Sequence, residues 1–262
     1  MTLALPPENL YGHTKKLRYL LAQIRAEQTR LGRPLRVLDF GCGNGSAVSQ
    51  YIIDLGVDYT GVDFHEPSLE YARARYAGEH ARFLPQAPGD GPYDVLVYSD
   101  VLEHLHDPAQ VLREHRPLLG DGGVLIGSVP NGYGPFEMEK RIGHYTGTGF
   151  ILTRLHRVLR KAKHKVRGSG EAGQTLPYNA ENGHVQFYTR KSLTHTLGRG
   201  GYGVDRFAKG CFLGSSLTAI LLRGGTIMRI NNALGDVLPA WAVSTWYFTA
   251  RPTAEQTQEP GL

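Results

Sequence analysis

A strand-like apolar segment that ends in three alternating glycines constrains the fold of this chain more than any other feature. Residues 37–45 read VLDFGCGNG, and the apolar half of this run is typical of a buried parallel strand. The glycines after it are Gly41, Gly43 and Gly45. Glycine lets the backbone turn sharply and lets a ligand approach without meeting a Cβ atom. The segment therefore predicts a strand, a ligand-binding turn and a helix that begins near Ser46.

A carboxylate at the end of the next predicted strand is the second feature that points to a bound ligand. This strand spans residues 58–63 and ends in Asp63, 24 positions after Asp39. In an open parallel sheet, ligands bind beyond the carboxyl ends of the strands. An aspartate at that place could accept hydrogen bonds from both hydroxyls of a ribose. The two features together predict a nucleoside that binds across adjacent strands.

The spacing of the glycines separates two classes of nucleoside cofactor. Nicotinamide and flavin dinucleotides are bound by G-x-G-x-x-G, with a helix N-terminus facing the pyrophosphate. Here the pattern is G-x-G-x-G, and Ser46 stands where the third glycine would fall. Asp39, just before the loop, would repel a pyrophosphate, whereas it could order the loop or hold an ammonium group through water. A nicotinamide-dependent reductase is an alternative that this pattern does not favour.

The same residues resemble motif I of the class I S-adenosylmethionine-dependent methyltransferases, and Asp63 matches the acidic residue with which that family binds ribose. Residues 99–108, SDVLEHLHDP, are similar to the motif of a subgroup that includes the ubiquinone-biosynthesis O-methyltransferases. The likeness extends to 130–137, PNGYGPFE, and to 183–193, GHVQFYTRKSL. It implies S-adenosylmethionine as cofactor and in-line methyl transfer to a small or lipid-linked acceptor, with oxygen favoured over nitrogen or carbon. A protein that binds the cofactor without turnover is the alternative.

Strand and helix patterns alternate along the chain and predict an α/β fold. We expect a Rossmann-like, doubly wound, mostly parallel sheet of the seven-stranded methyltransferase type within a single domain, residues 1–250. Helical insertions after strands five and six, residues 131–183 and 211–238, are expected to form lid and acceptor regions. Residues 251–262 are expected to be a disordered tail. The predicted strands are 35–40, 58–63, 81–84, 93–98, 123–130, 204–208 and 241–250.

A set of residues at the ends of these strands is expected to contact the cofactor. Asp63 is expected to bind the ribose, and Ser99 to lie beside the methionine part. Phe64 could lie against the adenine ring. The family often has an Asp after strand three that binds the adenine amino group, and this chain offers Gln86 there. The full set is Asp39, Gly41, Gly43, Gly45, Asp63, Phe64, Gln86 and Ser99.

Other polar residues are candidates for catalysis. Because a sulfonium methyl is already activated, the protein must align the acceptor, exclude water and, for a hydroxyl acceptor, remove a proton. Asp100, Glu103 and His104 follow strand four and would share one face if a helical turn began there. His184, where the first insertion returns, is the other candidate base. The triplet after strand four could also brace the loop or hold a divalent cation, and we predict no metal.

Positive charge is concentrated in one segment of the chain. The formal net charge is +5, and residues 151–167 contain seven Lys or Arg residues and no acid, so the remainder nets about −2. Apolar residues recur there at helical spacing, which predicts a basic amphipathic helix. This helix could pack on the core as a lid, contact an anionic membrane that holds a lipid-like acceptor, or bind an anionic substrate or RNA. Nucleic acid is disfavoured because no RNA-binding module is recognisable.

The remaining features predict a cytoplasmic protein, with peripheral contact to a membrane left open. Residues 1–13 have no basic region followed by an apolar stretch, so we expect no secretory signal. No run of about 18 apolar residues is present that could span a bilayer. The two cysteines, Cys42 and Cys211, give no disulfide framework, and Cys42 is interpreted as a packing residue. The sequence makes no prediction of the oligomeric state.

Overall fold

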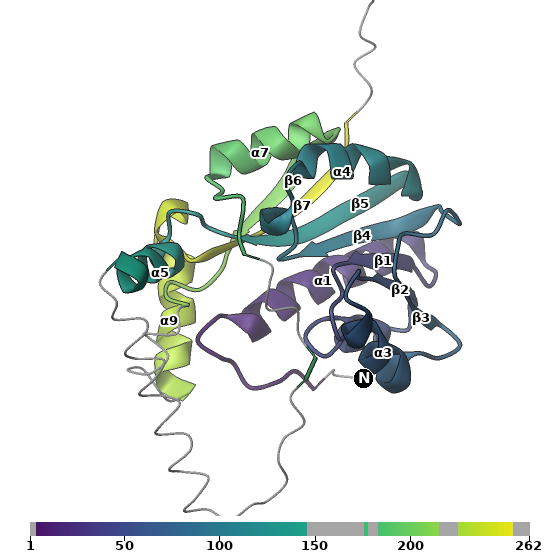
Figure 1. The fold of residues 1–262 in the computed structure, drawn as a ribbon, viewed down its shortest axis with the longest axis horizontal. Coiled ribbons are helices and arrows are strands. Elements are labelled where there is room, and N and C mark those ends of the chain that lie inside the picture. The colour runs from purple at the N-terminus through teal and green to yellow at the C-terminus, as the bar shows by residue number, and fades with distance from the viewer. Residues whose placement is uncertain (1–3, 146–175, 178–182, 215–224, 254–262) are drawn as a thin grey trace, which may run out of the picture.

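A mixed seven-stranded sheet forms the centre of the molecule (Figure 1). The computed structural model describes residues 4–145, 176–177, 183–214 and 225–253, and the statements below refer to these ranges. The strand order is β3-β2-β1-β4-β5-β7-β6, and β7 (Thr245–Pro252) pairs antiparallel with both β5 and β6. The pairs β1–β2, β1–β4, β2–β3 and β4–β5 are parallel. The other strands are β1 Arg36–Phe40, β2 Asp58–Val62, β3 Ala81–Leu84, β4 Tyr93–Ser99, β5 Leu119–Pro130 and β6 Tyr202–Lys209.

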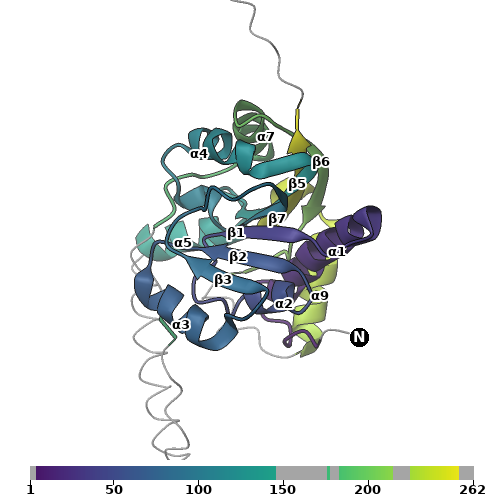
Figure 2. The same ribbon diagram turned by 90° about the vertical axis from the view of Figure 1, so that its right-hand side faces the viewer.

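Helices cover both faces of this sheet, with α1, α2 and α3 on one face and α4 and α7 on the other (Figures 1 and 2). Alternate residues of the central strand β4 therefore point into different cores. Val95 and Val97 belong to the core that includes Leu17 of α1, whereas Leu96 belongs to the core that includes Leu193 of α7. The predicted doubly wound fold class is confirmed. The helices are α1 His13–Leu31, α2 Ser49–Ile53, α3 Glu66–Tyr76, α4 Pro108–His115 and α7 Arg190–Arg199, with the short helices η1 Leu102–His104, η2 Arg116–Leu118 and η3 Ala240–Ala242.

Helix α1 forms where the pattern of apolar residues predicts it. Positions at helical spacing along one face are buried and pack against the sheet. They are Leu17, Leu20, Leu21 and Ile24. The helix ends at Gly32, whose φ of 64° is left-handed and whose N–H donates to the carbonyl of Gln28 at 2.9 Å. This packing fixes the position of Lys16 in the first turns of the helix, which matters for the site described below.

The last strand differs in its bounds from the prediction. It begins at Thr245 rather than at residue 241, because residues 240–242 form the short helix η3. It continues through Pro252, and Arg251 pairs with Gly203 of β6. The first residues of the predicted tail therefore belong to the sheet, and residues 254–262 lie outside the described part of the chain.

Both predicted insertions are described in part. In the first, α5 (Pro135–Tyr145) follows β5, and the basic segment 151–167 lies outside the described residues, so its three interpretations stay predictions. In the second, α9 (Gly225–Val237) contacts the start of α1, where the Nζ atom of Lys15 lies 2.8 Å from a carboxylate oxygen of Asp236. Within the described ranges, no helix is both long enough and apolar enough to cross a membrane.

Candidate functional site

The loop after β1 has the backbone that a closely approaching ligand requires. The φ angles of Gly41, Gly43 and Gly45 are 67°, 56° and 75°, in the left-handed region that favours glycine. A Cβ atom on Gly41 would lie 2.6 Å from the Cγ2 atom of Val101. The loop thus packs directly against the segment that follows β4, and a side chain at this glycine would force the two apart.

Asp63 lies beside this loop, just beyond the carboxyl end of β2. Its Oδ2 atom accepts a hydrogen bond from the N–H of Gly43 at 2.8 Å, and its Oδ1 atom accepts one from the N–H of His65 at 2.9 Å. The residue is only partly buried, so its carboxylate stays accessible to the hydroxyls of a ribose. Phe64, the next residue, is 70% exposed, and Gln86 is exposed just beyond β3. These residues follow the ends of neighbouring strands, at the edge of the sheet where the sequence predicts adenosine.

Asp39 faces the interior of the protein below the loop. It is 1% exposed and accepts hydrogen bonds from the hydroxyls of Tyr59 at 2.6 Å and Ser49 at 3.2 Å. Burial raises the pKa of Asp39 to about 6, although the two hydroxyl hydrogen bonds act against this shift. These contacts support the ordering of the loop by Asp39 more than they support a direct contact with the cofactor.

Asp39→Asn should change how stability depends on pH. The unfolded-state pKa of Asp is about 3.9, and Asp39 in the folded protein has a pKa of about 6. The folded protein therefore holds the proton of Asp39 more tightly than the unfolded chain does. The stability that this proton contributes is lost as pH rises from the unfolded-state pKa through the folded-state pKa. Asn keeps an acceptor but cannot ionise, so the free energy of unfolding of the variant, relative to the unaltered protein, should rise by about 2 kcal/mol between roughly pH 4 and pH 7. Urea unfolding at several pH values measures this difference, and a constant difference would contradict the assignment.

Asp100 is held in an ion pair at the end of β4. The Nζ atom of Lys16 in α1 lies 2.5 Å from its Oδ2 atom, and the hydroxyl of Ser128 donates to its Oδ1 atom at 2.6 Å. Burial alone would raise the pKa of Asp100, but the Lys16 ammonium and the Ser128 hydroxyl together lower it below its usual value. Its φ angle is 58° and η1 begins only at Leu102, so it does not share a helical face with the rest of the predicted triplet. Ser99, expected beside the methionine part, has its hydroxyl 3.3 Å from that of Ser128.

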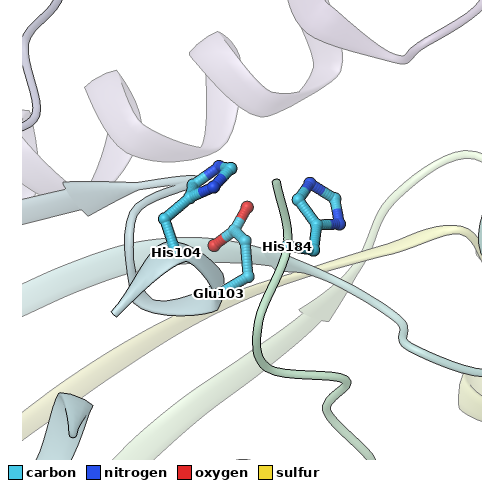
Figure 3. A group of neighbouring side chains, drawn as sticks. All are labelled: Glu103, His104 and His184. Carbon is cyan, nitrogen blue, oxygen red and sulfur yellow. The ribbon is translucent and has the colours of Figure 1, made fainter. Parts of the chain in front are cut away.

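Glu103, His104 and His184 come together beyond the end of β4 (Figure 3). One nitrogen or oxygen atom of each lies within 4.8 Å of the others, and the two imidazole rings meet edge to face with centroids 5.0 Å apart. Glu103 is 1% exposed, and its Oε2 atom has no hydrogen-bond partner among the described residues. Burial and the negative charge of Asp100 raise the pKa of Glu103 well above its usual range.

The segment 183–188 holds His184 over η1. The backbone N–H groups of Val185 and Gln186 both donate to the carbonyl oxygen of Glu103, at 2.9 Å and 3.0 Å. The side-chain amide of Gln186 adds hydrogen bonds to two carbonyls of the turn after η1. These bonds bring the end of the first insertion against the residues that follow β4.

Sequence reasoning missed the partner of His184. The Nδ1 atom of His184 lies 2.8 Å from the Oε1 atom of Glu137 in α5, 47 positions away, and Glu137 is 3% exposed. Glu137 stands inside the PNGYGPFE motif, but no periodicity relates it to His184, so only the likeness of that motif could have drawn attention to it. Lys16, the partner of Asp100, was missed for the same reason.

The first insertion also reaches the glycine loop. The carbonyl oxygen of Pro177 accepts hydrogen bonds from the side-chain amide of Asn44 at 3.0 Å and from the hydroxyl of Ser68 in α3 at 3.3 Å. Asn44 lies between the second and third glycines of the loop. The predicted lid role of this insertion stays a prediction, which this contact supports.

The cation site considered in the sequence analysis, at Asp100, Glu103 and His104, is not the group that the structure assembles. Asp100 is paired with Lys16, and His184 takes its place beside Glu103 and His104. We therefore assign these groups to hydrogen bonding and proton transfer and derive no step through a metal.

A family model and several curated proteins match this chain. A family model described as a methyltransferase domain matches residues 13–206. The ubiquinone biosynthesis O-methyltransferase of Caulobacter sp. (strain K31) is 37% identical over 101 residues, which cover 35% of this chain and 39% of that protein. The protein of the same name from Ruegeria pomeroyi is 36% identical over 129 residues, which cover 44% of this chain and 52% of that protein. The matched part of the chain thus spans two fifths to one half of the length of these relatives.

Solved structures share the fold. Magnesium protoporphyrin IX methyltransferase from Synechocystis, with bound S-adenosylhomocysteine, has a TM-score of 0.53 at 18% identity over 92% of this chain and 84% of that one. An S-adenosylmethionine-dependent methyltransferase from Mesorhizobium loti has a TM-score of 0.53 at 17% identity over 88% of this chain and 96% of that one. At these identities the likeness concerns the fold, and it confirms the predicted Rossmann-like architecture.

Proposed function

Because this chain belongs to the methyltransferase domain family, we propose that it transfers a methyl group from S-adenosylmethionine to an oxygen atom of a small or lipid-linked acceptor. S-adenosylmethionine is the methyl donor of this family. The observation that carries the proposal is the pairing of the glycine loop with Asp63 at the carboxyl ends of β1 and β2. The left-handed glycines let the cofactor approach the backbone, and the carboxylate can accept both hydroxyls of its ribose.

The residues beyond β4 suit the amino-acid end of the cofactor. When bound, the cofactor supplies a sulfonium methyl that needs no further activation. Lys16 and Asp100 place a cation and an anion side by side, and these charges match the carboxylate and the ammonium group of the methionine part. Ser99 lies next to them at the end of β4. The chain can therefore hold both ends of the cofactor and align its methyl group with an acceptor.

Two reasons favour oxygen as the methylated atom. The relatives from Caulobacter and Ruegeria pomeroyi are named O-methyltransferases. A hydroxyl acceptor must also lose a proton during transfer, and the site contains an imidazole, that of His184, with a carboxylate partner. An amine that already presents a lone pair would not need this arrangement.

Exposed aromatic side chains near His184 favour a ring-bearing or otherwise apolar acceptor. The guanidinium of Arg141 lies 4.9 Å from the centre of the Phe187 ring and 5.6 Å from that of Tyr133. Phe187 is 40% exposed and belongs to the same segment as His184, and Tyr133 is 57% exposed. An apolar acceptor could lie on these rings with its hydroxyl directed toward His184.

The proposal places the protein in the cytoplasm. Both of its cysteines, Cys42 and Cys211, are free and buried, and burial raises the pKa of each thiol. Unpaired, unreactive cysteines suit a reducing compartment. Contact of residues 151–167 with an anionic membrane remains part of the proposal for a lipid-linked acceptor.

Calorimetry and product analysis test the proposed function. We expect S-adenosylhomocysteine to bind without displacement by NADH. We also expect at least one phenol, catechol or carboxylic acid to gain a labelled methyl group from S-adenosylmethionine. Binding without transfer to any acceptor would favour a protein that holds the cofactor without turnover, and preferential binding of NADH would favour a reductase. Transfer to amines alone would overturn the assignment to oxygen.

A further inference from the structure

We propose that Glu137 is a positioning residue that fixes the tautomer of His184, so that the Nε2 atom of this imidazole takes the proton of the acceptor hydroxyl. The inference rests on the proposed O-methylation and deepens it. The observation behind it is the contact between the buried carboxylate of Glu137 on α5 and the imidazole of His184 on the segment 183–188. These two residues are 47 positions apart in the chain.

The hydrogen bond between the two side chains determines which nitrogen carries the proton. Nδ1 of His184 lies 2.8 Å from Oε1 of Glu137. With Glu137 ionised, its carboxylate can only accept, so Nδ1 of His184 donates and the lone pair of the neutral ring lies on Nε2. Glu137 is 3% exposed, and a hydrogen bond to a charged group is stronger where water is excluded.

The neighbours of the imidazole hold its plane. The ring of His104 contacts it edge to face, with centroids 5.0 Å apart and planes at 75°. The ring of Phe136 lies on the α5 side at 6.4 Å between centroids. Among the described residues, the titratable groups around His184 are Glu137 from α5 and Glu103 and His104 from η1, with Asp100 and Lys16 acting on Glu103. Contacts on two sides leave the imidazole little freedom to turn away from the acceptor.

Among the predicted catalytic residues, His184 is the best suited to accept a proton. Asp100 is paired with Lys16, and its lowered pKa makes it a weak proton acceptor. Glu103 is 1% exposed, so its carboxyl is buried away from an acceptor, and its raised pKa favours the protonated form. The Nδ1 atom of His104 lies 3.2 Å from the carbonyl oxygen of Gly183. The Nδ1 atom of His184 lies 2.8 Å from a buried carboxylate, which can stabilise the imidazolium that proton transfer forms.

The proton transfer completes a balanced substitution. The acceptor oxygen forms a bond to the methyl carbon while the bond from that carbon to sulfur breaks, and the electron pair of the broken bond neutralises the sulfonium. The hydroxyl proton passes to Nε2 of His184, and the imidazolium forms beside the Glu137 carboxylate. The proton then leaves to water. Glu137 thus stabilises the charged ring without touching the acceptor.

A double-mutant cycle tests whether Glu137 acts through His184. The probe acceptors are catechol and 3,4-dihydroxybenzoate, and kcat, KM and affinity for S-adenosylhomocysteine are measured for His184→Ala, Glu137→Gln and the double variant. We expect His184→Ala to lower kcat about 100-fold, and Glu137→Gln to lower it about 10-fold through loss of the charged partner. The double variant should be no slower than His184→Ala, because a positioning residue has no effect once its target is gone. Cofactor affinity should stay unchanged throughout.

Control measurements separate positioning from general damage and from metal chemistry. Glu139→Gln, on the same helix α5, should leave kcat unchanged. Multiplicative losses in the double variant would overturn the inference, because Glu137 would then act independently of His184. Loss of activity with EDTA that Mg²⁺, Mn²⁺ or Zn²⁺ restores would also overturn it, since the imidazole would then serve as a metal ligand.

A measurement without turnover keeps the inference separate from the proposed function. Long-range ¹⁵N–¹H spectra report which nitrogen of an imidazole is protonated. We expect the Nδ1–H tautomer of His184 in the unaltered protein and a shift toward Nε2–H in Glu137→Leu, which removes the acceptor. If S-adenosylhomocysteine binds but neither probe is methylated, the choice of acceptor fails while this result still decides the role of Glu137. An Nε2–H tautomer in the unaltered protein would overturn it.

Discussion

Asp63→Ala is expected to weaken the binding of S-adenosylhomocysteine about 5- to 150-fold. The carboxylate accepts the N–H of Gly43 at 2.8 Å and that of His65 at 2.9 Å, so it orders the glycine loop beside the proposed ribose site. Loss of hydrogen bonds to a charged group costs about 1–3 kcal/mol, which corresponds to this range of dissociation constants. Isothermal titration calorimetry with S-adenosylhomocysteine measures the change.

Asp58→Ala is the matched control for this experiment. Asp58 lies at the opposite end of β2, is exposed and contacts His80 at 2.9 Å, far along the strand from the loop. Its removal should leave the affinity unchanged. Equal losses in both variants would point to damage to β2, and an unchanged affinity in Asp63→Ala would mean that the ribose is held elsewhere.

The cofactor side of the protein was predictable because its signals are local. A run of apolar residues, the glycines that follow it and an acid after the next strand lie within 27 residues of one another, from residue 37 to residue 63. A left-handed backbone conformation favours glycine for steric reasons, so the spacing of the glycines indicates where the backbone turns. The apolar spacing on α1 likewise reports which face packs on the sheet. The fold and the left-handed glycine loop could therefore be inferred without a structure.

The acceptor side could not be inferred in the same way because its contacts join distant positions. Lys16 and Asp100 are 84 positions apart, and Glu137 and His184 are 47 apart, so no period relates them. Asp100 also has a φ of 58°, a left-handed conformation that the sequence pattern does not predict for a residue other than glycine. The prediction of a helical turn at Asp100 assumed an ordinary backbone. The tertiary ion pair with Lys16 and the bond to Ser128 override it.

Gly132→Ala should destabilise the protein by about 3 kcal/mol and lower turnover at the same time. A Cβ atom at Gly132 would lie 2.5 Å from the carbonyl carbon of Phe187 and 2.6 Å from the backbone nitrogen of Tyr188. The clash is with backbone, which cannot rotate away, so we expect the upper end of the usual overpacking cost of about 1–3 kcal/mol. For a chain of this size that corresponds to a fall of roughly 6–12 °C in the melting temperature, measurable by calorimetry.

The same substitution tests how His184 is held. The N–H of Gly132 donates to the carbonyl of Tyr188 at 2.9 Å, so the close contact joins the end of β5 to the segment that carries His184. Displacement of that segment should lower kcat while S-adenosylhomocysteine binding stays unchanged, because the cofactor loop lies on other strands. Gly183→Ala, in the same segment but with nothing within 4 Å of its Cβ position, should change neither quantity. A Gly132→Ala variant of unaltered stability would mean that the segment does not pack as closely as described. An unaltered kcat in a destabilised variant would mean that proton transfer does not depend on the position of His184.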